Sequence, residues 1–424
     1  MTAARRISDP VGWTLLLCGA FLSLAALGVS IPTKPYFDEI HYLPAARQYL
    51  IENGAYLNPE HPPLGKQLIA AGIALLGETP LGWRIMSVVA GTLALFAFCR
   101  ALWFATLSRF ASLIGGVLLI CAIPLFVHAR IAMLDIFMVA FVLAALWQLA
   151  AAMREPEHGR WRLIAGGVLI GLAMAAKWNA VPLAVVPGLA FMAARALAGR
   201  RRLLTSRRGA PVPGITLIEA ALWLGALPLA VYALTYWPAY ALLAQPPGHG
   251  IVGLHHEMIA LQKSVVQPHP YQSVWWQWLL DERAIWYLYE RVDGAQRGVL
   301  LVGNPVIMWP GLLALAWCAW AGMVKRNPAA LGIAVLFAVS FGMWIVAAKP
   351  IQFYYHYFLP SCFLVAALAV ALARMWQSGW RISALLLPAA AVASFAWFYP
   401  IVSGAPLSGG DQAFTRWMLL DGWR

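Results

Sequence analysis

Charged residues are scarce in this chain: they make up 11% of its 424 residues, whereas 62% are hydrophobic. A soluble domain carries about 25% charged residues. The composition therefore excludes an ordinary soluble protein, and it predicts an all-α protein that crosses a membrane several times.

Cysteine is scarce as well, and the spacing of the few cysteines does not match a metal-binding motif. Each of them lies in an apolar run, where small packed or lipid-facing side chains are expected. They therefore carry no information about the redox compartment. The five residues are Cys18, Cys99, Cys121, Cys318 and Cys362.

Eleven apolar runs are long enough to cross a bilayer, which takes about 17–25 helical residues. They lie at residues 11–31, 81–105, 110–128, 131–152, 162–177, 179–198, 215–242, 299–323, 329–348, 354–374 and 381–401. The segments 41–51 and 64–77 are shorter, and we expect them to form helices along the membrane surface.

A polar, aromatic-rich stretch divides the apolar runs into seven and four. We therefore expect three parts. The first is a catalytic seven-span module at 1–242, whose first outer loop is 32–80. A large outer loop at 243–298 follows, and a four-span module at 299–424 completes the chain.

Acidic residues are few and unevenly placed along the chain. With the N-terminus in the cytoplasm, the inner side holds 17 Lys and Arg, including Arg5, Arg6 and a cluster at 200–208, but only four acids. The outer side holds 13 residues of each sign. Because cytoplasmic loops are enriched in Lys and Arg, this pattern predicts an N-in, C-out chain. It accounts for the net charge of +13 and argues against nucleic acid as a partner.

The polar segment 36–66 concentrates reactive side chains directly after the first apolar run. It contains the adjacent carboxylates Asp38 and Glu39, followed by His61 and Lys66 on either side of a Pro-Pro pair. Carboxylates at a membrane edge are costly unless water, a cation or a substrate uses them. We therefore expect a reaction centre beside the bilayer.

Further ionisable residues lie near the outer ends of the spans: Arg84, Arg130, Asp135, Lys177, Lys349 and His356. Such charges normally face a bundle interior or a wet cavity, so one outward-opening polar cavity would explain them all. Other roles stay open. Arg130 and Asp135 could form a structural ion pair, the lysines could reach lipid headgroups, and His356 could belong to an interfacial aromatic belt.

A carboxylate and several cations in one cavity suit transfer from a lipid-phosphate donor. The carboxylate can take the proton of an attacking hydroxyl, and the cations can stabilise the departing phosphate. Asp38 and Glu39 could divide the work of base and orienting group, or they could hold a divalent cation such as Mg or Mn. Their spacing does not decide between these alternatives.

Seven motifs resemble, in one order along nearly the whole chain, those of the polyprenyl- or dolichyl-phosphate-mannose–protein mannosyltransferases, glycosyltransferase family 39. The first joins Asp38-Glu39 to His61-Pro62-Pro63-Leu64-Gly65-Lys66. The others lie at 83–87, 129–135, 171–178, 269–278, 303–306 and 356–360.

The resemblance implies a GT-C fold and inverting transfer of mannose from a polyprenyl-phosphate donor to Ser or Thr hydroxyls of exported polypeptides. It makes Asp38 the general base, with Glu39 supporting the base or the acceptor, and it lets Asp135 orient Arg130 or Lys66. His269 and the tryptophans around Trp276 would cover the sugar. The residues expected to contact the donor are His61, Lys66, Arg84, Arg130, Asp135, Lys177, His269, Trp276 and His356.

The segment 243–298 stands where eukaryotic members of that family carry a β-trefoil domain. This departure matches the bacterial type, which implies an inner-membrane protein whose site faces the periplasm or exterior. A second copy of the chain as a partner stays open.

Two rival functions share some of these features. Another GT-C transferase could deliver a lipid-linked sugar to lipid A, a lipopolysaccharide core or a cell-wall glycan, and the motifs at 269–271 and 303–305 favour protein as the acceptor over these. A transporter of lipid-linked sugar would need polar residues in both halves of the membrane. Here they lie in the outer half, which favours an enzyme.

Overall fold

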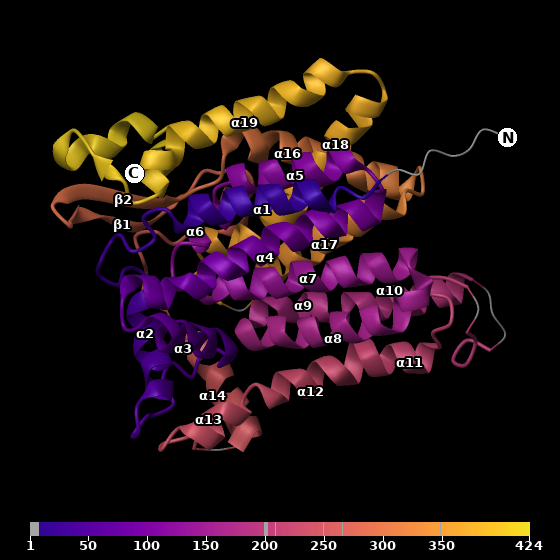
Figure 1. Cartoon of the computed structure of the whole chain (residues 1–424), viewed down its shortest axis with the longest axis horizontal. Helices are drawn as coiled ribbons and strands as arrows, with labels where there is room; N and C mark the ends of the chain where they lie inside the picture. Colours follow the sequence, from indigo (N-terminus) through magenta and orange to yellow (C-terminus); the bar gives the residue numbers. More distant parts are fainter. Residues whose placement is uncertain (1–7, 199–201, 208, 249, 265, 348) are drawn as a thin grey trace.

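The computed structural model describes residues 8–198, 202–207, 209–248, 250–264, 266–347 and 349–424. Arg5, Arg6, Arg200, Arg201 and Arg208, which contributed to the predicted orientation, lie outside the described residues. Long helices run side by side along the long axis of the molecule (Figure 1).

Nine helical segments of the described chain are long and apolar enough to cross a membrane. They are α4 (Pro80–Thr106), α7 (Leu134–Arg154), α8 with the turn before it (Pro156–Ala176), α9 and α10 (Trp178–Leu197), α11 to α13 (Leu217–Leu242), α16 (Pro305–Met323), α17 (Pro328–Val346), α18 with its preceding turn (Tyr354–Gln377) and α19 (Arg381–Val402). Within them, the separate helices are α8 (Gly159–Ala176), α9 (Val181–Ala184), α10 (Val186–Leu197), α11 (Leu217–Ala221), α12 (Leu227–Leu234), α13 (Trp237–Leu242) and α18 (Phe358–Gln377).

The two remaining apolar runs also form helices. They correspond to α1 (Val11–Ala26) and to α5 (Arg109–Cys121), which α6 (Pro124–His128) continues. Every apolar run of the sequence therefore coincides with helix, and the chain is a multi-span membrane protein. The number of crossings and the N-in orientation stay predictions.

Short elements gather at one end of the bundle, on the left in Figure 1. They include α2 (Glu39–Arg47), α3 (Leu64–Leu76) and α14 (Gly250–Ser264), and α15 (Trp275–Leu279) follows in the chain. The first two match the short helices expected after the first span. This end carries the segment 36–66, and it is therefore where the site must be built.

A small antiparallel sheet lies at the same end, and it corrects the expectation of a purely helical chain (Figure 1). Strands β1 (Ile285–Val292) and β2 (Ala295–Leu301) form a hairpin, and β3 (Pro406–Leu407) pairs with β2. Asp293 and Gly294 supply the turn with φ of 49° and 72°, the left-handed values that a tight hairpin requires. Because β2 continues past residue 298, the expected boundary between 298 and 299 falls inside a strand.

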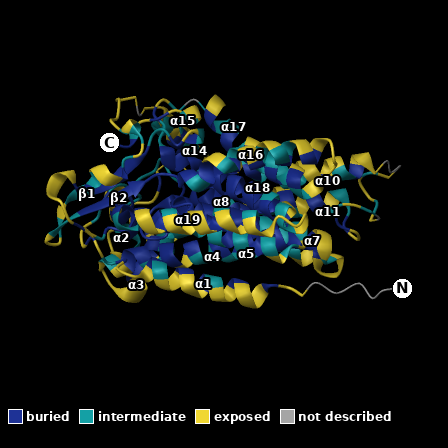
Figure 2. Ribbon diagram, turned by 90° about the horizontal axis from the view of Figure 1, so that it is seen from above, coloured by how far each residue is buried: buried dark blue, intermediate teal, exposed yellow. Residues whose placement is uncertain are grey.

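The centre of the bundle is formed by α18 and α7. In their most apolar stretches, 83% and 67% of the residues are buried, against 17% in the segment from α11 to α13. Figure 2 shows exposed residues along α1 and α19, which cover the centre from outside. The central helices begin at Phe358 and Leu134, so their first turns face the end that carries the sheet.

Asn304 joins three helices at this core. Its side chain accepts from the N–H of Val306 and so caps α16. It also donates to the backbone oxygens of Cys121, at 2.9 Å, and Ala391, at 3.1 Å. The motif at 303–306 therefore ties the ends of α5 and α16 to the middle of α19.

Candidate active site

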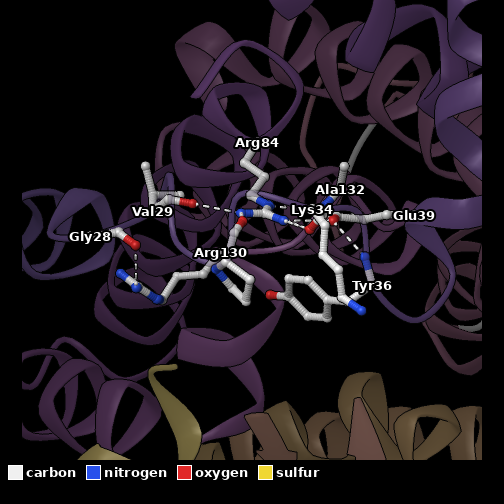
Figure 3. A network of polar contacts seen from close by, with 9 residues as sticks. Gly28, Val29, Lys34, Tyr36, Glu39, Arg84, Arg130 and Ala132 are labelled. Atoms are coloured by element: carbon white, nitrogen blue, oxygen red, sulfur yellow. Dashed lines mark hydrogen bonds and ion pairs between the residues drawn. The ribbon is translucent and has the colours of Figure 1, made fainter. Parts of the chain in front are cut away.

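Glu39 and Arg84 form a fully buried ion pair (Figure 3). Two guanidinium nitrogens of Arg84 contact the two carboxylate oxygens of Glu39 at 2.8 Å each. The same oxygens accept from the backbone N–H groups of Ala132, at 2.9 Å, and Tyr36, at 3.3 Å. The hydrogen-bonding capacity of this carboxylate is therefore largely used inside the protein.

Arg84 has no donor to spare either. Besides Glu39, its guanidinium donates to the backbone oxygens of Val29, Pro32 and Lys34 at 2.7–3.1 Å (Figure 3). A guanidinium carries five N–H groups, and all of them have partners here. Arg84 thus fastens the chain that leaves α1 to the start of α2.

Arg130 fastens the same region to the C-terminal module. It donates to the backbone oxygens of Ala25, Leu27 and Gly28 at the end of α1, and to that of Ser403 beyond α19. It does not pair with Asp135, which has another partner. The ion pair between Arg130 and Asp135, which the sequence left open as an alternative, is therefore not formed.

Lys66 is buried at the start of α3. Its ammonium donates to the backbone oxygens of Leu57, Asn58 and His61 at 3.3, 2.6 and 2.9 Å. Three carbonyl oxygens match the three hydrogens of an ammonium group. Lys66 therefore closes the loop that precedes α3.

Asp38 differs from these residues because its carboxylate is half-buried and has a single hydrogen-bond donor. Tyr42, one turn later, donates to one of its oxygens at 3.3 Å. Burial raises the pKa of Asp38 above its usual range, the nearby charge of Lys177 lowers it, and Asp135 raises it. Asp38 thus holds an accessible carboxylate oxygen between charged neighbours.

Phe37 determines the direction of Asp38. Its φ of 51° is in the left-handed region, which is strained for a residue with a side chain. Its ring stacks on Tyr287 of β1 with a centroid distance of 4.0 Å and meets Tyr355 edge-on at 6.0 Å. The hydroxyl of Tyr287 in turn contacts His128 at 3.1 Å. The sheet therefore supports the turn that presents the carboxylate.

Lys177 and Asp135 form a second buried ion pair. The ammonium of Lys177, at the end of α8, lies 2.6 Å from the carboxylate of Asp135 in the first turn of α7. The same ammonium faces the ring of Tyr355 at 5.0 Å. One hydrogen bond leaves two N–H groups of Lys177 for other oxygens.

Lys349 and His61 complete the titratable residues near Asp38 and Lys177. Burial and the charge of Lys177 lower the pKa of Lys349 to about 8, and its ammonium forms no hydrogen bond with the described residues. Burial, together with the charges of Lys177 and Lys349, lowers the pKa of His61 well below its usual range. These surroundings favour the neutral form of His61, and its ring meets that of Tyr42 edge-on at a centroid distance of 5.8 Å.

His356 is buried in the turn before α18 and retains a free ring nitrogen. Its Nδ1 lies 3.0 Å from the backbone N and O of Phe353, whereas Nε2 has no partner among the described residues. When Nδ1 accepts from the N–H of Phe353, Nε2 carries the proton. The ring would then offer one unused donor.

Within the tryptophan cluster expected to cover the sugar, Trp278 rather than Trp276 lies against His356. Trp278 is fully buried and its ring lies 6.0 Å from that of His356. Trp276 is 43% exposed. His269 is also exposed, and it meets Phe353 edge-on at 5.1 Å.

The expected site residues thus fall into two groups. One group surrounds a common region and consists of Asp38, His61, Asp135, Lys177 and His356. The other group binds protein atoms and consists of Glu39, Arg84, Arg130 and Lys66. Three further residues that the sequence motifs did not select belong to the site or its support: Tyr42, Tyr287 and His128. Lys349, one of the charges expected in the outer cavity, also lies in this region. Because Glu39 is fully engaged, the adjacent carboxylates do not fit a shared metal ion.

Comparisons with known proteins agree with this architecture. Residues 60–225 match a family described as dolichyl-phosphate-mannose-protein mannosyltransferase. Residues 249–423 match one described as the C-terminal four TMM region of protein-O-mannosyltransferase.

Two solved structures and one curated relative extend the comparison. The Pmt1-Pmt2 complex of Saccharomyces cerevisiae, bound to its sugar donor, gives a TM-score of 0.81 at 14% identity over 98% of this chain and 93% of that chain. ArnT of Cupriavidus metallidurans gives 0.59 at 16% identity over 93% and 66%. The polyprenol-phosphate-mannose–protein mannosyltransferase of Mycobacterium tuberculosis is 30% identical over 95% of this chain and 89% of its own length.

The likeness to the solved structures shows a GT-C fold, and the curated relative spans almost the entire chain. The helical bundle, the buried ion pairs at one end and both family matches point the same way. The chain belongs to the polyprenol-phosphate-mannose–protein mannosyltransferase family of membrane enzymes.

Proposed function

We propose that the chain transfers mannose from a polyprenyl-phosphate donor to Ser or Thr hydroxyls of exported polypeptides. The observation that carries this proposal is the contrast at Asp38, whose carboxylate keeps an accessible oxygen beside Lys177 while its neighbour Glu39 is fully engaged. A base needs such an oxygen within reach of the acceptor hydroxyl.

In the proposed step, Asp38 takes the proton of the acceptor hydroxyl as its oxygen attacks C1 of mannose. A new C1–O bond forms, and the bond between C1 and the phosphate oxygen breaks. The phosphate leaves with the electron pair on the opposite face of the sugar, so the configuration at C1 inverts. Negative charge thus develops on the departing phosphate.

We propose that three groups stabilise that phosphate: the ammonium groups of Lys177 and Lys349 and the Nε2 of His356. Each has donor capacity that the described protein does not use, and Lys177 and Lys349 carry positive charge. Preorganised donors stabilise charge that develops in the transition state. Asp135 holds Lys177 in place.

The other predicted residues receive positioning roles. Glu39, Arg84, Arg130 and Lys66 hold the segment that carries Asp38, because their polar atoms bind backbone and each other. His61 lines the site because its ring contacts Tyr42, which donates to Asp38. We assign the cover of the site to Trp278 and the loop around His269, with Trp276 on its exposed side.

We propose an N-in chain in a bacterial inner membrane, with the site on the periplasmic or outer side. The charge distribution of the sequence supports this orientation. The end that carries Asp38 would then meet exported polypeptides as they leave the membrane.

The test is incubation of purified protein in nanodiscs with radiolabelled polyprenyl-phosphate mannose, a Ser/Thr-rich peptide and a lipid acceptor together. We expect label in the peptide for the wild type and none for Asp38→Asn. Label that enters lipid or glycan alone would overturn the assignment of the acceptor. Label in the peptide with Asp38→Asn would overturn the assignment of the base.

A further inference from the structure

A cavity lies at the end of the bundle remote from Asp38. It has a volume of about 830 Å³ and lies between the last turns of α4, α7 and α18 and the connection from α16 to α17. Asp135 and Arg154 are at opposite ends of the 21-residue helix α7. At 1.5 Å per residue the two ends are roughly 30 Å apart, so this cavity is separate from the proposed active site.

The cavity is lined by cations without acids. Arg154, Lys325 and Arg374 border it, together with neutral polar residues such as Thr106 and Asn327. Lys325 and Arg374 are exposed and form no ion pair or side-chain hydrogen bond with the described residues. Three cations facing one hollow create a positive potential that suits a phosphate group.

An apolar groove continues from this cavity into the bundle. It has a volume of about 380 Å³ and runs between α4 and α7 on one side and α17 and α18 on the other. Arg154, Ala105, Pro328 and Ala329 line both spaces, so the groove and the cavity meet at these residues. Deeper in, the groove is lined by apolar side chains such as Leu143, Ile333 and Phe363.

We propose that this combined space binds one anionic phospholipid of the leaflet remote from the active site. Its phosphate would lie between Lys325 and Arg374, with one acyl chain in the apolar groove. Charge complementarity at the mouth and apolar lining beyond it match the two parts of such a lipid.

Arg154 connects the lipid to the protein framework. Its guanidinium donates to the backbone oxygens of Phe104, at 3.0 Å, and Ala105, at 3.2 Å, at the end of α4. Two bonds leave three of its five N–H groups for the headgroup. The lipid would therefore join the N-terminal module, through α4 and α7, to α17 and α18.

The first test compares phosphatidylglycerol with phosphatidylcholine by native mass spectrometry of the delipidated full-length protein. We expect the wild type to retain one phosphatidylglycerol under activation that removes phosphatidylcholine. The double variant Lys325→Gln/Arg374→Gln should bind phosphatidylglycerol roughly thirtyfold more weakly, since each cation near a lipid surface contributes about a factor of five. The matched control Arg202→Gln/Arg207→Gln removes two inner-side cations that do not line the cavity, and it should retain the lipid.

The second test fills the groove. A Cβ at Gly332, which lines the groove, would meet no atom within 4 Å, so Gly332→Trp should fold and exclude the acyl chain. Gly19→Trp, on the exposed face of α1, has the same free space and should retain the lipid. Equal retention of both lipids by the wild type, or full retention by the double variant and by Gly332→Trp, would overturn the proposal.

Discussion

Asp38 and Glu39 are neighbours in the chain, but their carboxylates differ in burial and in hydrogen bonding. Glu39 is fully buried, and its oxygens accept four hydrogen bonds from Arg84, Ala132 and Tyr36. Asp38 is half-buried and accepts one long hydrogen bond from Tyr42. The Glu39 carboxylate is held by protein atoms, whereas we propose that the Asp38 carboxylate meets a reactant.

The cations divide in the same way. Backbone oxygens accept hydrogen bonds from Arg84, Arg130 and Lys66. In contrast, Lys177 and Lys349 have N–H groups that donate to no described residue. A buried charge is stable only with partners, so a cation whose N–H groups are all used by protein atoms is structural. Unused capacity at a shared location is the better indication of chemistry.

The largest effect is expected from Asp38→Asn. The amide cannot take a proton from the acceptor, so kcat should fall about a thousandfold, within the usual range for general-base catalysis. The melting temperature and donor binding should stay close to wild type, because the single bond from Tyr42 can be kept by an amide oxygen. Turnover assays with labelled donor and thermal melts measure the two effects. If the melting temperature fell together with kcat, Asp38 would have a structural role like that of Glu39, and the proposed difference between the two carboxylates would be wrong.

Glu39→Gln should affect stability first. Removing the charge leaves Arg84 buried without its counter-ion, and breaking such a pair typically costs about 3–5 kcal/mol. We expect a lower melting temperature in detergent and a lower yield of folded protein, measured by size-exclusion chromatography. The exposed pair of Arg47 and Glu78 offers a matched control, because Glu78→Gln should change the melting temperature little. A stable but inactive Glu39→Gln would instead assign this carboxylate to the reaction.

Lys349 should produce the alkaline limit of activity. Its pKa is lowered to about 8, so its positive charge is lost as the pH rises through that value, and with it one contact to the departing phosphate. Lys349→Gln should reduce kcat/KM about 10- to 100-fold at pH 7, the range for a hydrogen bond to a charged group. Lys349→Arg should retain activity and move the alkaline limit upward, since a guanidinium stays charged. A pH profile that is identical in wild type and Lys349→Arg would contradict this role.

Much of the fold could be predicted because long apolar runs are a strong signal. All eleven runs coincide with helices, and the short helices before α4 were expected from their length. The hairpin of β1 and β2 is absent from the predicted elements, although Asp293-Gly294 is a clear turn signal between the aromatic-rich β1 and the strand β2, which ends in aliphatic residues. The apolar residues at the end of β2 fall within the predicted span 299–323, which therefore begins too early.

The candidate site was predicted less completely, for a physical reason. A sequence shows which residues can carry charge, but not which hydrogen-bond donors the fold already uses. Arg84, Arg130 and Lys66 therefore looked like phosphate ligands, and Trp276 could not be distinguished from Trp278. Exposure and partner atoms, which depend on tertiary packing, separate them.

The smallest effect is expected from the aromatic support of Asp38. Phe37 is strained at φ 51°, and its stacking on Tyr287 at 4.0 Å offsets that strain. Phe37→Ala should lower kcat about 2- to 10-fold, the value of one aromatic pair, because the loop then samples positions in which the carboxylate misses the acceptor. Phe37→Tyr keeps the ring and should stay near wild type.

The property that Phe37→Ala loses shows whether the Phe37 ring orients the base or only packs against its neighbours. If the ring orients the base, kcat falls while donor affinity and melting temperature change little, as for a mild version of Asp38→Asn. If the ring only packs, the variant loses stability and resembles Glu39→Gln. Because Tyr287 also stacks on Phe37, Tyr287→Ala should reproduce the first pattern, and the double variant should lose little more than either single one.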